Sequence, residues 1–520
     1  MKLHVVSSAP QLPLWARQML ERMLAQANVS WHGWTQVSNA VQAPSFWSRC
    51  YQQLDQRAMG RGIKIDRMAT PADAPPASVA QWPLVAGAVQ IPDAARQAWQ
   101  TAGIDLVIWL LELPPASADT LHTLPIWGLT LDGSALAMHP QAGAHAMLHA
   151  PHLCETRLQD YAASPPTVLY RSLSAAVTNS LGATRQRALS KALAFMPRVL
   201  AAQLEQRQFT APTQADPAGP LSPAPQPGGL TLLSGVVRRV LANRLERRRH
   251  LDQWQVAYSF NPTARWDQLE QFTFLEPPKE VFWADPMPLY WQGKHWILFE
   301  ELPFAALRGH LLAMEVQADG RCGQPQALMS RDFHLSYPFV VKDGEQLYMV
   351  PETAATRRVE LHRCVEFPGR WELQAVLVDG VNAVDATLHR HSDGRWWMWV
   401  SVVEEGAERG EELHLYYADQ LLGPWQAHAA NPVISDIRCA RPAGPIMVTP
   451  TGLVRPAQNS ADAYGHHIEW RQIQELSPTT YVETSLGDLR PQGNPAWLRM
   501  HTVAEADGLK VVDVMVRRAR

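Results

Sequence analysis

The C-terminal half of the chain repeats one pattern of polar and apolar residues. A polar residue opens a short apolar strand, a turn containing glycine follows, and a second apolar strand returns, as in ADPMPLYWQGKHWILFEE and VDATLHRHSDGRWWMWVSV. Glycine supplies the positive φ that a tight hairpin turn needs. A repeat of about 50 residues predicts a β-propeller, and five copies predict five blades. The turn glycines of the five repeats are Gly293, Gly344, Gly394, Gly452 and Gly508.

The polar residue that opens each repeat is predicted to face the propeller axis. The innermost strand of every blade lines the axis, so equivalent positions on these strands converge on one place. The residue type changes between repeats while the surrounding pattern is kept, which favours a ligand site over a purely structural position. A strand near residues 254–260 is expected to pair with the last blade. The five opening residues, spaced by 52, 48, 56 and 60 positions, are Asp285, Tyr337, Asp385, Arg441 and His501.

The N-terminal region alternates strand-like and helix-like patterns. Leu3–Val6 and Ile104–Leu111 are apolar runs typical of buried strands, and Trp15–Leu24 has helical spacing. Such alternation favours a Rossmann-type α/β domain with a parallel sheet. The segment APTQADPAGPLSPAPQPGG, at 211–229, is rich in proline and glycine and is predicted to be an extended linker. The predicted multidomain chain has an α/β domain at 1–205, a linker at 206–230, a basic helix and propeller-closing strand at 231–271, and the five-bladed propeller at 272–520.

A basic helix is predicted over residues 236–250, VVRRVLANRLERRRH, where six arginines occupy much of the surface outside one apolar face. One interpretation is a solvated helix docked on a neighbouring domain. The other is peripheral contact with anionic lipid headgroups. The small apolar face favours docking. Its residues are Val236, Val237, Val240, Leu241 and Leu245.

The composition of the chain limits which binding partners and which cellular location we expect. With 46 basic and 49 acidic residues among 520, the net charge is −3, which gives no electrostatic reason to expect nucleic acid as a partner. Five scattered cysteines without a CxxC pair disfavour a disulfide framework or a zinc site. The start of the chain lacks the pattern of a secretion signal, and no apolar run approaches the roughly 18 residues of a membrane span. We expect a cytoplasmic protein, with the inner membrane face as a peripheral site, and predict neither metal nor cofactor.

The axial residues suit glycosyl chemistry. Asp285 and Asp385 come from alternate blades, and Glu352 ends the returning strand of the second blade. Paired carboxylates serve such chemistry because one can protonate the leaving oxygen while the other activates the attacking group. These three are the predicted catalytic residues. The predicted substrate-binding residues are His334, Tyr337, Arg441, Arg455, Gln458 and His501.

Arg441 and Arg455 each open an Arg-Pro-Ala triplet and would suit a phosphate or carboxylate on the ligand. Structural interpretations compete with these roles. An aspartate at the start of a strand often caps a turn, and Asp385 with Arg441 would equally form a buried ion pair. The sequence leaves both interpretations open.

Short segments in a fixed order run through residues 272–517, among them WADP, HLSYPFV, PETA, AVDATL, RPAGPI, RPAQ and MHT. In these the chain resembles the propeller of the glucosamine inositolphosphorylceramide transferase family. The resemblance implies a sugar transferase of glycoconjugate or glycolipid assembly. In plant members a separate transferase domain, absent from this chain, follows the propeller, and bacterial relatives carry the propeller after a formyltransferase-like domain.

This propeller is in turn similar to those of glycoside hydrolase families 43, 32 and 68. That similarity implies an aspartate in blade one, an aspartate in blade two and a glutamate in blade three. Asp285 matches the first of these, but blade two presents Tyr337 and blade three presents Asp385. The hydrolase triad is therefore not reproduced.

The N-terminal region resembles formyltransferase-like domains in the segments LPLWARQMLERML and VLYRSLSAAVTNSLGATRQRALSKA. Such an enzyme uses an asparagine, a histidine in a His-Pro-Ser-Leu-Leu-Pro-like loop, and an aspartate. The corresponding stretch here, LPIWGLTLDGSALAMHP, keeps only His139 before a proline. We therefore expect a domain without formyl-transfer chemistry.

Three functions stay open. The first is a sugar-transferase-type enzyme that acts on a sugar-phosphate, nucleotide-sugar or glycolipid at the axis, with Asp285 as base and Glu352 or Asp385 as acid. The second is a family 43-like glycoside hydrolase with rearranged acids, which a cytoplasmic location disfavours. The third is a non-catalytic sugar-binding or scaffold module.

Overall fold

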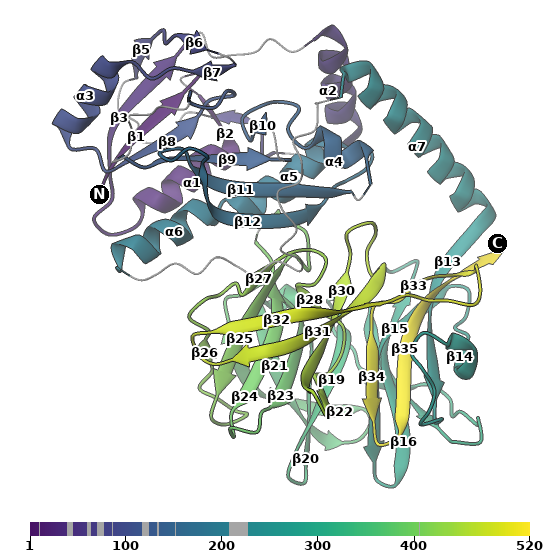
Figure 1. The fold of residues 1–520 in the computed structure, drawn as a ribbon. Helices are drawn as coiled ribbons and strands as arrows, with labels where there is room; N and C mark the ends of the chain where they lie inside the picture. The colour runs from purple at the N-terminus through teal and green to yellow at the C-terminus, as the bar shows by residue number, and fades with distance from the viewer. Residues whose placement is uncertain are drawn as a thin grey trace. The chain divides into compact units, whose positions relative to one another are not determined.

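A computed structural model shows two compact units (Figure 1). The first contains the N-terminal residues and the start of helix α7 (Gly229–Arg249) as far as Ala242, and the second begins at Asn243 and contains the propeller. Most of the predicted linker lies at 207–226, outside the described residues. The structure describes residues 1–9, 11–38, 45–59, 64–69, 77–85, 87–116, 124–132, 135–150, 152–206, 227–404 and 406–519.

The N-terminal unit is built on one mixed sheet with the strand order β12-β11-β9-β8-β1-β3-β5, and β10 pairs with β9. The five strands from β9 to β5 run parallel, whereas β11 and β12 are antiparallel. The two apolar runs predicted as strands form the adjacent strands β1 and β8, where both faces are covered. The strands are β1 (Lys2–Ser7), β3 (Ser30–Val37), β5 (Ser78–Ala80), β8 (Leu106–Leu110), β9 (Ile126–Leu131), β10 (Ala135–Leu136), β11 (Leu153–Asp160) and β12 (Thr167–Ala175), with the short pairs β2 (Leu12–Pro13) and β4 (Met68–Ala69), and β6 (Leu84–Val85) and β7 (Ala88–Val89).

Helices cover this sheet through apolar faces. The helix predicted at 15–24 is α1, which buries Trp15, Met19 and Met23, one above another at four-residue spacing. These side chains share a core with β1 and β8. The predicted α/β architecture is therefore confirmed. The helices are α1 (Leu14–Leu24), α2 (Phe46–Met59), α3 (Asp93–Ala102), α4 (Ala144–Leu148), α5 (Leu181–Ala192) and α6 (Phe195–Leu204).

Helix α7 begins at Gly229, before the predicted start and inside the predicted linker range. Its first turns dock on the N-terminal unit, because buried Leu232 packs in a cluster with Tyr51 and Met147. Arg239 donates hydrogen bonds to the carbonyl oxygens of Met147 and Thr178, at 2.8 and 2.7 Å. Among the described residues, no helix is both long and apolar enough to cross a membrane.

The predicted apolar face of α7 is only partly buried. Val236 packs against the cluster of Leu232, but Val237, Leu241 and Leu245 are 49%, 61% and 50% exposed. The docked side is made instead by Leu232 and Leu233, which lie before the predicted start of the helix. The docking interpretation therefore holds for the start of the helix and not for its later turns.

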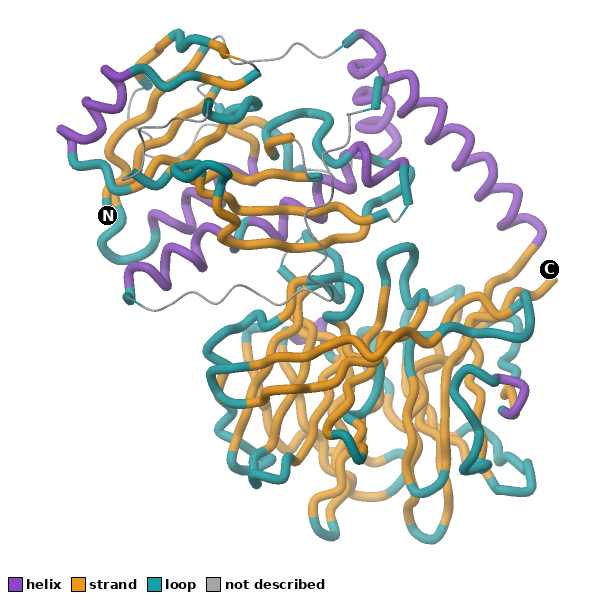
Figure 2. Tube along the Cα trace, viewed as in Figure 1, coloured by secondary structure: helices purple, strands orange, loops and turns teal. Residues whose placement is uncertain are grey.

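The C-terminal unit is the predicted five-bladed propeller, built almost entirely of strands (Figure 2). Each sheet is antiparallel, and consecutive segments of the chain form consecutive blades. Blade one is β15 (Val281–Trp291), β16 (Lys294–Pro303), β17 (His310–Val316) and β18 (Gln326–Met329). Blade two is β19 (Ser336–Asp343), β20 (Gln346–Glu352), β21 (Arg358–Glu366) and β22 (Arg370–Asp379). Blade three is β23 (Ala383–Arg390), β24 (Trp396–Val402), β25 (Glu412–Ala418), β26 (Gln426–Ala427) and β27 (Ile434–Ser435).

Blade four has the same antiparallel plan, and blade five joins both ends of the unit. Blade four is β28 (Arg441–Pro442), β29 (Met447–Thr449), β30 (Gly452–Asn459), β31 (His467–Leu476) and β32 (Tyr481–Leu489). Blade five is β33 (Trp497–Arg499), β34 (Val503–Ala506), β35 (Leu509–Ala519), β13 (His250–Ser259) and β14 (Thr273–Leu275).

Strand β13 closes the ring of blades. It pairs antiparallel with β35 along its whole length, from His250 opposite Ala519 to Ser259 opposite Lys510. The first and last strands of the propeller thus belong to one blade, and the hydrogen bonds between them close the ring of blades. All five turn glycines of the repeats have positive φ, between 58° and 120°, as the hairpins require.

Candidate functional site

In blades one to three, a β-bulge presents the residue predicted to face the axis. The register shifts by one residue just after Ala284, Ser336 and Val384. The next residue in each case is Asp285, Tyr337 or Asp385, with φ of 53°, 45° and 55°. A left-handed backbone is unfavourable for a residue with a side chain, by about 1–3 kcal/mol, and such strain gathers at functional sites. The bulge re-aims the side chain, so each blade delivers one polar group to the axis.

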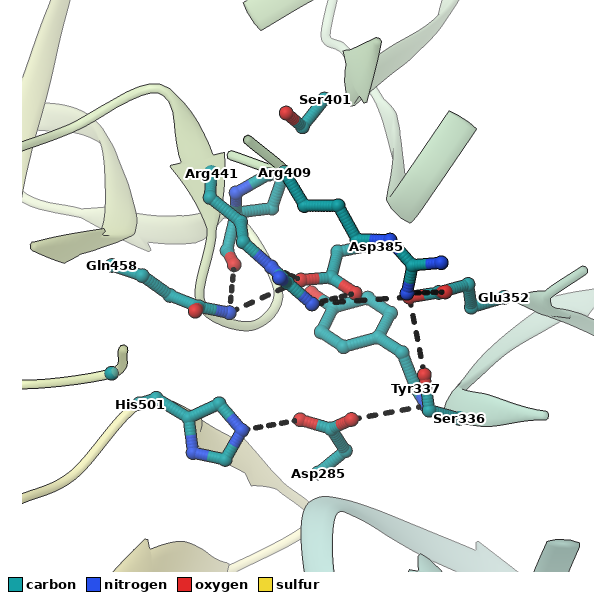
Figure 3. Close-up of polar contacts among 12 residues, drawn as sticks. Asp285, Ser336, Tyr337, Glu352, Asp385, Ser401, Arg409, Arg441, Gln458 and His501 are labelled. Atoms are coloured by element: carbon teal, nitrogen blue, oxygen red, sulfur yellow. Dashed lines mark hydrogen bonds and ion pairs between the residues drawn. The ribbon is translucent and has the colours of Figure 1, made fainter. Parts of the chain in front are cut away.

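The residues that open the five repeats meet as predicted (Figure 3). Arg441 lies on β28 of blade four, and His501 lies two residues before the start of β34 in blade five. Asp285 accepts a hydrogen bond from the backbone N–H of Tyr337 at 3.3 Å, and its Oδ1 lies 3.1 Å from Nε2 of His501. All five side chains are buried, with at most 6% of the surface of any one exposed.

Arg441 joins the carboxylates of blades two and three (Figure 3). Its guanidinium donates to both oxygens of Asp385, through Nε and, at 3.2 Å, through Nη2. The same Nη2 lies 3.8 Å from Oε2 of Glu352. Gln458 on β30 adds a hydrogen bond from its amide to Asp385, at 3.1 Å. The ion pair that the sequence left as an alternative is therefore present.

In blades one to three, a second tier of polar residues lies on the second strand, directly opposite the residue before the bulge. Glu300 faces Ala284, Glu352 faces Ser336, and Ser401 faces Val384. Glu352 accepts a hydrogen bond from the hydroxyl of Ser336, at 3.2 Å. The sequence prediction named Glu352 and missed Glu300, although both end the returning strands of their repeats.

The buried carboxyl groups have sharply different pKa values. Burial opposes ionisation of Asp285, but the hydrogen bond and charge of His501 outweigh it and hold its pKa below the ordinary value. Burial and the charge of Asp385 raise the pKa of Glu352 to about 7. Burial, with the charges of Asp285 and Glu352, raises the pKa of Glu300 well above its usual range. The cluster therefore sets Asp285, whose pKa is lowered, beside two glutamates whose pKa values are raised, a difference that can separate a base from an acid.

Three partly exposed side chains border this cluster. Tyr464 is 46% exposed, and its ring centre lies 5.1 Å from the Arg441 guanidinium and 5.4 Å from the His501 ring. Arg409, with half of its side chain exposed, lies 3.5 Å from Oε1 of Glu352. The side chain of His334 is 34% exposed and lies 3.6 Å from Glu300. Tyr464, Arg409 and His334 thus border the buried carboxyl groups on the side of the solvent.

The structure contradicts one predicted ligand contact. Arg455 is completely buried and forms two hydrogen bonds with Glu483, at 3.0 and 2.7 Å, while Arg471 donates to the same carboxylate at 2.9 Å. Side chains alternate along a strand, so Arg455 and Gln458, three positions apart on β30, point to opposite faces. Only Gln458 faces Asp385, and Arg455 belongs to a buried ion network of blade four.

The fold and this cluster define a five-bladed propeller with a buried, charged axial site. Residues 252–502 match the family model described as glucosamine inositolphosphorylceramide transferase 1, N-terminal. Glucosamine inositolphosphorylceramide transferase 1 of Oryza sativa subsp. japonica is 31% identical over 232 residues, which are 43% of this chain and 31% of that protein. The protein of the same name from Arabidopsis thaliana is 30% identical over 209 residues, 39% of this chain and 27% of that protein. The chain thus spans about a third or less of the relatives' length, and the match lies in the propeller.

Solved structures with a related fold include glycoside hydrolases. CoXyl43, a family 43 β-xylosidase/α-arabinofuranosidase from a compost microbial metagenome, aligns with 47% of this chain and 93% of its own, at 12% identity and a TM-score of 0.35. RS223-β-xylosidase aligns with 45% of this chain and 92% of its own, at 10% identity and a TM-score of 0.34.

Proposed function

We propose that the propeller is the carbohydrate-active part of a sugar-transferase-type protein of glycoconjugate or glycolipid assembly, with its site at the axial cluster. The observation that carries this proposal is the different setting of two axial carboxyls. Asp285 lies 3.1 Å from His501, which holds its pKa below the ordinary value, whereas Glu352 is buried and takes a hydrogen bond from Ser336, and burial with the charge of Asp385 raises its pKa to about 7. Enzymes that act on glycosidic bonds need one ionised and one protonated carboxyl. The sequence match to sugar transferases over the propeller supports the same class.

In this mechanism the two carboxyls have different tasks. Ionised Asp285 accepts the proton of the attacking hydroxyl as its oxygen forms a bond to the anomeric carbon. The bond from that carbon to the leaving oxygen breaks in the same step, and Glu352 gives its proton to the leaving oxygen. Arg441 stays paired with Asp385 and lies 3.8 Å from Glu352, so it fixes the position of the acid.

The border of the cluster suits a sugar that carries an anionic group. The exposed face of Tyr464 offers a surface on which a sugar ring can stack, and the half-exposed guanidinium of Arg409 can pair with a phosphate. The matched relatives are named for glucosamine and inositolphosphorylceramide. A nucleotide-activated glucosamine and inositol phosphate are therefore the first probes.

Calorimetric titration of the full chain with these two probes tests the proposal. Replacing Arg409 by alanine should weaken binding about tenfold, the lower end of the range for a charged hydrogen bond, because half of the side chain is solvated. Arg321→Ala is the matched control, since Arg321 is 75% exposed and pairs with Asp319 in an outer turn of blade one. Equal loss in both variants, or no binding of either probe, would contradict the proposal.

The internal pairing of the cluster favours a second candidate, a sugar-binding module without turnover. Arg441 is held by Asp385 and His501 by Asp285, so the charges already satisfy one another. Binding of a probe without any transfer or hydrolysis would support this function. A family 43-like hydrolase is less well supported, because Tyr337, whose hydroxyl lies 2.7 Å from that of Thr387, occupies the position where the similarity implies an acid.

We infer that the N-terminal domain is a scaffold without formyl-transfer activity. His139 is the remnant of the expected loop, and its backbone carbonyl accepts a hydrogen bond from Arg185 at 3.0 Å. Gly133 and Ser134 in the same stretch lie outside the described residues. The full chain, given formyl-tetrahydrofolate and an amino sugar, should release no tetrahydrofolate above the rate without protein. Release that depends on the amino sugar would overturn this inference.

We also propose a cytoplasmic location with peripheral membrane contact through α7. Its later turns expose Val237, Leu241 and Leu245 along one side at four-residue spacing, on a helix rich in arginine. Such a surface suits anionic headgroups. The chain should sediment with vesicles that contain anionic lipid and not with neutral vesicles, and Leu241→Glu should weaken this. Equal sedimentation with both kinds of vesicle would contradict the proposal.

A further inference from the structure

Asp513, a residue that the sequence prediction missed, anchors the junction of blades five and one. It lies on β35 and is fully buried. Its carboxylate accepts hydrogen bonds from the backbone N–H groups of Asp285, His501 and Thr502, at 3.0, 3.0 and 2.9 Å. These three bonds fix the Asp513 carboxylate between the backbone of blade one and that of blade five.

The imidazole of His501 lies between two carboxylates. Its Nδ1 is 2.9 Å from Oδ2 of Asp513, and its Nε2 is 3.1 Å from Oδ1 of Asp285. A neutral imidazole has a single N–H, so only the doubly protonated ring can donate to both acids. Trp254 packs on the ring, with centroids 4.2 Å apart, and only 2% of His501 is exposed. Water therefore has little access to compete for either hydrogen bond.

We propose that Asp513 and His501 act as positioning residues for Asp285, by forming a buried carboxylate–imidazolium–carboxylate chain that keeps Asp285 ionised and fixes its orientation. Two carboxylates at ion-pair distance, one on each ring nitrogen, favour the charged ring, and the two acids raise the pKa of His501 to about 10 although burial alone would lower it. Tyr464 also packs against the ring, and the charges of Glu300 and Asp385 act on it as well. Thr502 supports the same orientation through a hydrogen bond to Oδ1 of Asp285, at 3.0 Å.

This arrangement accounts for a grouping that otherwise resembles a metal site. Ligand atoms of Asp285, His501 and Asp513 lie within 4.8 Å of one another. Both ring nitrogens already face carboxylate oxygens at hydrogen-bonding distance, and the imidazolium supplies the positive charge that a metal would bring. The role of the chain in catalysis rests on the proposed function, but the protonation state of His501 does not.

Histidine-selective ¹³C and ¹⁵N labelling of the full chain can measure that protonation state by NMR, with His501→Gln identifying the signal. In the wild type, the His501 ring should stay doubly protonated until about pH 10. Asp513→Asn removes one of the two charges, so the titration should move by at least one pH unit toward 6.5. Asp393→Asn is the matched control, because Asp393 lies 3.1 Å from His391 at a surface turn, and it should leave the His501 signal unchanged.

A wild-type His501 that titrates at or below pH 6.5, or an unchanged titration in Asp513→Asn, would overturn the proposal. If Asp513→Asn does not fold, the pH dependence of the free energy of unfolding, measured for the wild type and for His501→Gln, tests the same proposal. The folded-state pKa of His501 lies above its unfolded value, so its contribution to the free energy of unfolding is complete below pH 6.5 and is lost as pH rises toward about 10. His501→Gln should flatten this decline. An equally steep decline in that variant would contradict the proposed carboxylate–imidazolium–carboxylate series.

A kinetic readout separates this inference from the proposed function. Where turnover is measurable, the acidic limb of kcat/KM, set by Asp285, should move to higher pH in His501→Gln, because the positive charge that lowers the pKa of Asp285 is gone, while KM changes little. A purely structural His501 would lower the amount of folded protein without moving that limb. If no substrate is turned over, the proposed function fails. The NMR titration still decides whether His501 is a charged imidazolium between the two carboxylates.

Discussion

Replacing Arg441 by alanine should lower the free energy of unfolding by about 3–5 kcal/mol, the largest stability effect we expect from a single axial residue. Only 6% of Arg441 is exposed, and its guanidinium holds both oxygens of Asp385, which is fully buried. Without the arginine, Asp385 stays in the interior with only the amide of Gln458 as a side-chain donor to it. Removal of one partner from a buried ion pair is costly for this reason. Chemical denaturation of the two proteins measures the difference.

Two further variants distinguish the loss of the ion pair from an unspecific loss of stability. Arg441→Met combined with Asp385→Leu removes both charges and should recover most of the stability lost in Arg441→Ala, since neither charge is left unpaired. Arg321→Ala, at an exposed ion pair, should change stability by less than about 1 kcal/mol. A loss below that size in Arg441→Ala would show that Asp385 does not depend on the arginine.

Asp285→Asn should lower turnover by a factor of about 10² to 10⁴, the usual contribution of a general base, while leaving the ligand bound. The amide keeps the size of the side chain but cannot take a proton from the attacking hydroxyl. The structure also predicts a stability effect, because Asp285 pairs with His501. Loss of this charged hydrogen bond should lower the free energy of unfolding by roughly 1.5–3 kcal/mol without abolishing the fold. Kinetics and denaturation on the same preparation test both statements.

The control for this variant is Asp393→Asn, an aspartate-to-asparagine change at a partly exposed turn next to a histidine. It should change neither turnover nor binding. Turnover within tenfold of wild type in Asp285→Asn would mean that another group is the base. A variant that no longer folds would mean that Asp285 is chiefly structural.

The blades and their axial residues could be predicted because the propeller repeats its local pattern. Each hairpin needs a glycine with positive φ, so the turns mark the repeat and fix which residue opens the next strand. Asp285, Tyr337 and Asp385 were placed correctly at the axis for this reason. The bulges that aim them could not be predicted, since a one-residue register shift leaves no distinct residue type in these strands.

The errors at the site have physical causes as well. Arg455 was assigned to the ligand because its triplet resembles that of Arg441, but the alternation of side chains along β30 turns it toward Glu483. Glu300 was missed because no rule distinguished it from its neighbour Glu301. Asp513 was the one charge in the apolar run VVDVMV, and a lone charge in a buried strand is a signal that needs a partner. Only the fold of blade five, which brings the segment before β34 against β35, shows that this partner is His501.

The most direct test of the axial site is a crystal structure of the Asp285→Asn variant with a nucleotide-activated glucosamine bound. The account predicts the sugar ring against Tyr464, with an oxygen of the reacting bond within about 2.7–3.2 Å of Glu352, the range of a hydrogen bond. The side chain at position 285 should face the same anomeric carbon. Binding of the sugar on an outer face of the blades, or an empty axis at a concentration that saturates the protein in calorimetry, would contradict the account.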